Sequence, residues 1–156
     1  MPSDSVSQLG RRVSRGDAGP LISSAFDHLP SAVVLFDHAK SIAAWNLPAT
    51  DLFADHGTSL AVGVSLSNIL HGLLEGGVID LGGEEPQVWH RRVMAAHSSG
   101  NSFDQALSDG QVLRVRVSAC DHGLVAAYTD ITDLYSRERE LRDSRQRMRR
   151  MNEIGV

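Results

Sequence analysis

The chain has 156 residues and a formal net charge of -4, with 42% hydrophobic and 22% charged residues, a composition typical of one globular domain. Cys120 is the only cysteine, which excludes an internal disulfide framework and a zinc site of the Cys-x-x-Cys type. The longest strongly apolar run, residues 32–36, is far shorter than the ~20 residues of a membrane-spanning helix, and no apolar signal segment opens the chain. We therefore expect a cytoplasmic protein, or the cytoplasmic part of a larger one, without membrane insertion.

The first third of the chain predicts a leader, a short helix and a hairpin. Residues 1–19 contain Ser, Gly, Asp and Arg without periodicity, which predicts a flexible leader. A helix is expected over residues 20–29, because Pro20 suits a first helical turn, apolar residues recur at helical spacing and Pro30 ends the run. Residues 32–37 and 41–45 predict two strands joined by a tight turn.

Three helices and three strands are predicted next. Asn46 is expected to cap a helix over residues 47–53, and Ser65 or Ser67 to cap a second helix that ends at Gly76. A third helix is expected over residues 84–97. Strands over residues 103–107, 112–117 and 124–129 are separated by two strong turn signals, and the pattern is helical from Ile131 onward.

This order of elements, with four sequence motifs, resembles the PAS domain family over roughly residues 21–133. The resemblance lies in residues 25–37, in Ala44-Trp45-Asn46, in residues 107–113 and, most specifically, in Tyr128-Thr129-Asp130-Ile131-Thr132-Asp133. An Asp-Ile-Thr triplet at the end of the last strand is typical of PAS domains in bacterial signalling proteins. The similarity is closest to PAS domains of bacterial histidine kinases and diguanylate cyclases, whose third helix resembles residues 89–97.

The resemblance implies an α+β fold. It has a five-stranded antiparallel sheet of order 2-1-5-4-3 with helices on one face, a short N-terminal helix, and a C-terminal signalling helix of coiled-coil type. The expected organisation is a leader over residues 1–19, a PAS domain over residues 20–133 and an output helix over residues 134–156. No phosphate-binding loop, nucleophile elbow or metal cluster stands in the sequence, so we expect no enzyme; any kinase or cyclase activity would lie outside this chain.

A ligand pocket between the sheet and the helices follows from the resemblance. Its expected lining residues are apolar or aromatic and lie on the predicted strands and helices: Trp45, Phe53, Ile69, Leu73, Trp89, Val93, Leu113, Val115, Val125 and Ala127. The alternative is that these side chains simply fill a core.

Two histidines raise the question of haem, which some PAS domains hold through a histidine on the third helix. His90 and His97 lie seven residues apart, about 10.5 Å along a helix, so they are too far apart to chelate one metal together. Each could act singly, but His97 also suits a helix C-terminus and His90 an exposed position near Glu84. We expect no metal and no cofactor, with haem as the minor alternative. A flavin photoreceptor is disfavoured because Cys120 lacks the Asn-Cys-Arg context that such a site needs.

Asp130 and Thr132 are expected, by the resemblance, to form the signalling hinge. Asp130 is predicted to accept a charge-assisted hydrogen bond from Arg114 or Arg116, while Thr132 or Asp133 caps the final helix. The alternative is that these residues serve only as helix caps.

The last 23 residues differ in charge from the rest of the chain. Residues 134–156 hold seven arginines against four acidic residues, 7 − 4 = +3, so the remainder carries about -7. Leu134, Leu141 and Met148 recur every seven residues, which predicts a dimer helix, although Glu138 and Arg145 would fill the alternate layer. The alternative is a solvated cationic helix. Nucleic-acid binding is not expected, because the remainder of the chain is acidic and no base-reading motif is present.

These patterns together predict a sensory and dimerisation module of a bacterial two-component system. The expected partners are a second copy of the chain, an output domain and a small-molecule ligand. A histidine kinase is the favoured whole protein. The alternatives are the sensor of a diguanylate cyclase and a constitutive protein-interaction scaffold without a ligand.

Overall fold

The computed structural model describes residues 18–154, so most of the predicted flexible leader, residues 1–17, lies outside the described part. Five strands form one antiparallel sheet in the order β2-β1-β5-β4-β3, which confirms the predicted PAS topology. The strands and helices, in chain order, are α2 (Gly19–Asp27), β1 (Ala32–Asp37), β2 (Ile42–Trp45), α3 (Leu47–Asp55), α4 (Leu66–Glu75), α5 (Pro86–Ser99), β3 (Phe103–Ala106), β4 (Val112–Cys120), β5 (Gly123–Asp130) and α6 (Thr132–Ile154).

The helix boundaries follow local capping chemistry. The Asn46 side chain accepts a hydrogen bond from the amide of Ala49 at the start of α3, and Ser65, rather than Ser67, caps α4. The third predicted helix, α5, begins at Pro86, two residues later than expected, because proline needs no amide partner in a first turn. It ends at Gly100, whose φ of 68° is left-handed.

Asn46 also joins three separate segments of the chain. It is fully buried, and its Oδ1 accepts from the Val33 amide at 2.8 Å as well as from Ala49. Its Nδ2 donates to the Phe26 and Ser31 carbonyls at 2.9 and 3.0 Å. With every polar atom of this amide satisfied, β1, α3 and the end of α2 are held in one arrangement.

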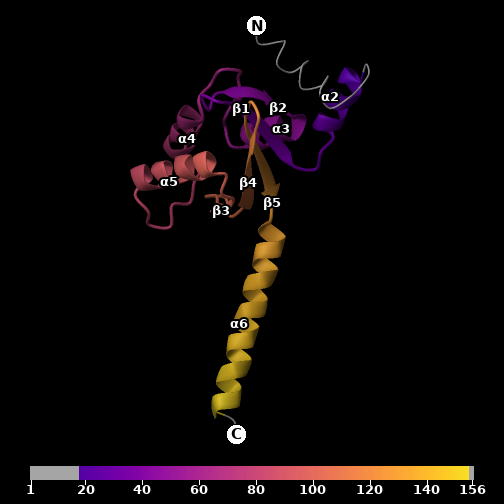
Figure 1. The fold of residues 1–156 in the computed structure, drawn as a ribbon. Coiled ribbons are helices and arrows are strands. Elements are labelled where there is room, and N and C mark those ends of the chain that lie inside the picture. Colours follow the sequence, from indigo (N-terminus) through magenta and orange to yellow (C-terminus); the bar gives the residue numbers. More distant parts are fainter. Residues whose placement is uncertain (1–17, 155–156) are drawn as a thin grey trace.

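The core lies on one face of the sheet, beneath α3, α4 and α5 (Figure 1). Its largest fully buried side chains include Trp89 of α5, Leu66 of α4 and Ile42 of β2. The final helix α6 leaves the end of β5 and projects away from this domain (Figure 1). Every side chain from residue 133 to residue 154 is exposed.

Candidate functional site

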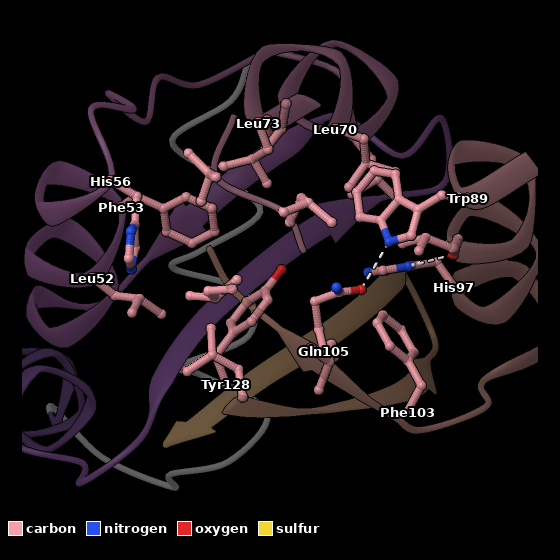
Figure 2. Close-up of a pocket in the computed structure, with 18 residues that line it drawn as sticks. Leu52, Phe53, His56, Leu70, Leu73, Trp89, His97, Phe103, Gln105 and Tyr128 are labelled. Carbon is pink, nitrogen blue, oxygen red and sulfur yellow. Dashed lines mark hydrogen bonds between the residues drawn. The ribbon is translucent and has the colours of Figure 1, made fainter. Parts of the chain in front are cut away.

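A cavity of about 60 Å³ lies between the sheet and the three helices that cover it. Its walls are almost entirely apolar, and α3, α4, α5, β3, β4 and β5 all contribute side chains to them (Figure 2). Seven of the ten predicted pocket residues line it: Phe53, Ile69, Leu73, Trp89, Val93, Leu113 and Val115. The 3.6-residue period of the helices and the alternation of β4 placed these side chains on the inward faces.

Val125 and Ala127 of β5 do not line the cavity, and their predicted inward orientation is wrong. Ala126 pairs with Val34 and Tyr128 with Val115, so these two β5 residues share the core face with their buried partners. Because side chains alternate along a strand, Val125 and Ala127 point to the opposite face. The run 124–128 is apolar on both faces, and the sequence alone did not reveal which set points inward.

Trp45 is the third predicted residue outside the cavity. It packs against the core from the end of β2, and its indole Nε1 donates to Thr50 Oγ1 of α3 at 3.0 Å. That hydrogen bond directs the ring toward α3, and Trp45 is not among the residues that line the cavity.

The polar residues of the cavity are not among the predicted pocket residues. His56, Gln105 and Tyr128 line it along with His97, for which the sequence suggests either a haem ligand or a histidine at a helix C-terminus. Gln105 Oε1 accepts from Trp89 Nε1 at 2.8 Å, and this buried pair closes one side (Figure 2). The alternation of Gln105 with the outward Asp104 on a predicted strand was the signal that could have placed it inside.

His97 is almost completely buried, with 2% of its surface exposed. Its Nδ1 donates to the Val93 carbonyl at 2.8 Å, and its ring meets Phe36 and Phe103 edge-on. Burial lowers the pKa of His97, so the ring is neutral near pH 7. Its Nε2 is buried and has no hydrogen-bond partner among the described residues.

Tyr128 and His56 present two further polar groups to the same space. Figure 2 shows the Tyr128 hydroxyl directed into the cavity and His56 on the side opposite His97. Burial raises the pKa of the Tyr128 hydroxyl, which keeps it protonated. His56 Nε2 is buried and without a hydrogen-bond partner in the described part of the chain, while its Nδ1 lies 3.9 Å from Asp109 Oδ2, beyond hydrogen-bond distance.

The cavity does not fit haem. His90 lies outside it, where its Nε2 is 3.1 Å from Ser67 Oγ and its ring stacks on His71 at 4.2 Å. His97 does face the cavity, but a cavity that holds benzene measures about 150 Å³, and a porphyrin is several times larger than benzene. In this conformation about 60 Å³ leaves no room for a porphyrin.

Asp130 and Thr132 connect the sheet to α6, although not through the predicted arginine contact. Asp130 Oδ1 accepts from the Thr132 amide at 2.9 Å and from the Thr132 hydroxyl. The Asp130 side chain thus bonds the first amide of α6, whereas the predicted caps, Thr132 and Asp133, lie within the helix. Thr132 Oγ1 in turn accepts from the Val112 amide at 3.0 Å. The first residue of α6 is therefore bonded directly to the first residue of β4.

The predicted arginine partners of Asp130 lie elsewhere. Arg114 donates to both carboxylate oxygens of Asp104, its cross-strand neighbour, at 2.9 and 3.2 Å. This contact lowers the pKa of Asp104. Arg116 pairs with Ala127 in the ladder, three positions from Asp130 along β5. Cross-strand register, which the sequence did not specify, decides this pairing.

The side chains of the predicted dimer seam are exposed. Leu134, Leu141 and Met148 have 46%, 54% and 64% of their surface accessible in the single chain. Among the described residues, no helix is both long and apolar enough to cross a membrane. The described part of the chain also contains no group of three or more His, Cys, Asp or Glu side chains placed to hold a metal ion.

The model of the PAS fold matches residues 26–140. An RNA-binding light-oxygen-voltage receptor is 13% identical with a TM-score of 0.53, and the match covers 85% of this chain and 38% of that one. The sensor region of a sensor histidine kinase is 14% identical with a TM-score of 0.49, and the match covers 67% of this chain and 40% of that one.

A third structure is a single domain. The photoactive yellow protein domain of the sensor histidine kinase Ppr from Rhodospirillum centenum is 17% identical with a TM-score of 0.44, and the match covers 69% of this chain and 91% of that domain. A comparison with curated proteins gave no match. At 13% identity, the light-oxygen-voltage receptor shows a likeness in fold alone. Because the family match spans most of the chain, from the end of α2 through the sheet and into α6, the chain belongs to the PAS family.

Proposed function

We propose that this chain is a sensory and dimerisation module that passes the state of its cavity to an output domain through α6. The favoured whole protein is a cytoplasmic histidine kinase of a bacterial two-component system. That choice rests on the sequence resemblance of residues 128–133 and 89–97 to PAS domains of such kinases. The sensor of a diguanylate cyclase is the alternative output.

The main support for this proposal is that two of the strands that line the cavity, β4 and β5, also hold the first turn of α6. Tyr128 and Val115 are paired across β5 and β4, and both line the cavity. Four residues after Tyr128, Thr132 bonds to the Val112 amide, three residues before Val115. A ligand that moves Tyr128 or Val115 therefore acts on strands whose ends position α6.

Transmission requires that a ligand bind two arrangements of α6 with different affinity. The Asp130 carboxylate and the Thr132 hydroxyl form the side-chain hydrogen bonds that join the sheet to α6. We expect these hydrogen bonds to differ between the two arrangements of α6. Pairing of α6 with a second copy through Leu134, Leu141 and Met148 would then carry the change onward as a shift in helix angle or register.

To test the proposed function, we enlarge one side chain that lines the cavity and one neighbouring side chain that does not line it. Val115→Leu adds bulk toward the cavity, and Val117→Leu adds the same bulk on the same face of β4, at a residue that does not line the cavity. We expect Val115→Leu to keep its denaturation midpoint and to change amide hydrogen exchange at residues 132–136, at the start of α6. Val117→Leu is expected to lose about 1–3 kcal/mol through overpacking.

A constitutive scaffold is the second candidate, and the small volume of the cavity favours it. A scaffold with a filled core would lose stability in both Val115→Leu and Val117→Leu. Amide hydrogen exchange at the start of α6 would then show no change specific to Val115→Leu. A native mass spectrum adds an independent criterion. Extra mass retained on the protein supports the sensor, whereas bare protein together with two destabilised variants would make the scaffold the better account.

A further inference from the structure

His97 presents an unsatisfied hydrogen-bond acceptor to the cavity. The Val93 carbonyl can only accept, so the Nδ1 atom that lies 2.8 Å from it must carry the hydrogen. Burial disfavours the charged form, which leaves Nε2 of the neutral ring as a bare lone pair. This atom is buried and lacks a partner in the described structure, and a buried polar atom without a partner is destabilising because it has lost its hydrogen bonds to water.

The remaining lining restricts what could satisfy that atom. No Asp, Glu, Lys or Arg is among the described residues that line the cavity, so an ionised ligand would be buried without a counter-charge. An apolar body is needed against walls such as Ile69, Leu70 and Val93. The ligand must therefore be neutral and apolar, and it must carry a hydrogen-bond donor for His97.

A hydroxyl group can meet the polar atoms of His97 and Tyr128 through a single oxygen. The Tyr128 hydroxyl points into the cavity and makes no hydrogen bond to the described protein, so it offers a donor to a ligand oxygen (Figure 2). A hydroxyl both donates and accepts, as His97 Nε2 and Tyr128 together require. His56 Nε2, on the opposite side, leaves a place for water or a second polar atom.

The volume of the cavity sets an upper limit on the size of the ligand. About 60 Å³ is less than half of the ~150 Å³ that accommodates benzene, so one ring is the largest body that modest side-chain movement could admit. Leu52, Leu73 and Val78 are half-buried members of the wall and have room to shift outward.

We propose that the cavity binds a small neutral alcohol or phenol whose hydroxyl donates to His97 Nε2. This inference rests on the proposed sensory function and names the class of ligand for the same site. Larger conjugated cofactors such as haem are excluded from this conformation by size.

The test compares phenol with toluene, which has nearly the same shape but no hydroxyl. Binding is measured from the NMR shifts of methyl groups in the cavity wall, in the wild-type chain and two variants. His97→Phe removes the acceptor and keeps a ring against Phe36 and Phe103. His90→Phe is the matched control, because His90 lies on the same helix, outside the cavity, and the new ring preserves the stack on His71.

We expect His97→Phe to weaken phenol binding about tenfold or more and to change toluene binding less than about threefold. His90→Phe is expected to leave both affinities near the wild-type values. In the wild type, phenol but not toluene should shift the ¹⁵N resonance of His97 Nε2, a readout that needs no variant. His97→Leu serves as a second acceptor-free variant if His97→Phe does not fold.

Two results would overturn the inference. If the ratio of phenol affinity to toluene affinity is the same in His97→Phe as in the wild type, the cavity binds ligands without using His97. This result would contradict the inference but not the proposed sensory function. If neither probe binds the wild type and the His97 resonance does not move, the assigned ligand class is wrong. The proposed function is then judged separately by the Val115→Leu and Val117→Leu pair, which needs no ligand.

Discussion

His97 illustrates how one side chain acquires its properties from position. Its place in the sequence of α5 predicts a helix end, where a protonated histidine is favoured by the helix dipole. In the structure its surroundings are Phe36, Phe103 and the apolar cavity, and desolvation outweighs the backbone hydrogen bond that would favour the cation. Burial therefore makes His97 a neutral acceptor.

The lowered pKa of His97 predicts acid sensitivity. In the unfolded chain its pKa is near 6.5, and in the folded chain it is lower, so between these values the unfolded state binds more protons. The His97 contribution to stability is complete above the unfolded pKa and falls as the pH drops below about 6.5, by at most about 1.4 kcal/mol per pH unit. Urea midpoints at pH 7 and pH 5 measure this loss.

His97→Phe should show a smaller loss of stability between pH 7 and pH 5 than the wild type, whereas His90→Phe should keep the wild-type loss. An unchanged pH dependence in His97→Phe would contradict the assignment of a neutral, buried His97.

At the scale of elements, the pairing of β1 with β5 depends on one glycine. Gly123 begins β5 opposite Asp37, and a Cβ atom built there would lie 1.8 Å from the Phe36 carbonyl oxygen. The Phe36 carbonyl belongs to the backbone of β1, so it cannot move aside as the end of a flexible side chain can. Only glycine therefore allows the two central strands to pair along their whole length.

We predict that Gly123→Ala destabilises the domain by about 3 kcal/mol or more, because the strand ends must separate. Gly72→Ala is the matched control, since Gly72 lies within α4 and a Cβ atom built there would have nothing within 4 Å beyond its own helix backbone. It should gain about 0.5–1 kcal/mol from helix propensity. Chemical denaturation measures the free energy of unfolding of both variants. Equal stability of Gly123→Ala and Gly72→Ala would contradict the steric clash expected at Gly123.

At the scale of the whole molecule, the domain and α6 have opposite characters. The domain buries its apolar residues beneath three helices, whereas α6 projects away from the domain (Figure 1). Leu134, Leu141 and Met148 of α6 are exposed. Propensity and i,i+4 pairs stabilise a lone helix only slightly, because most helix stability in proteins comes from packing. A second copy of α6 would supply that packing.

Leu141→Glu is predicted to weaken self-association at least about tenfold, because an unpaired carboxylate in a helix seam costs several kcal/mol. Gln146→Glu makes the same change of charge on the other side of α6 and should leave association unchanged. Sedimentation equilibrium measures both. Association that survives Leu141→Glu would place the contact between copies outside this seam.

The order of strands and helices was predictable because it follows from short-range chemistry. Asn46 and Ser65 cap helices, Pro86 starts one, and turns at residues 109–110 and 121–122 separate strands. The Asp-Ile-Thr motif located the junction with α6. These signals act within a few residues, so they can be recognised without knowing what packs against them.

Contacts across the sheet decide which β5 side chains point into the core and which residues bond to Asp130. Val125 and Ala127 are as apolar as Ala126, and only pairing with Val34 and Val117 turns Ala126 inward. Arg114 meets Asp104 rather than Asp130 because the β3–β4 register places them opposite each other. The unsatisfied nitrogen of His97 likewise arises from the apolar groups gathered around it, which come from segments far apart in the chain. Such properties depend on which distant atoms share a volume, and a linear pattern does not contain that information.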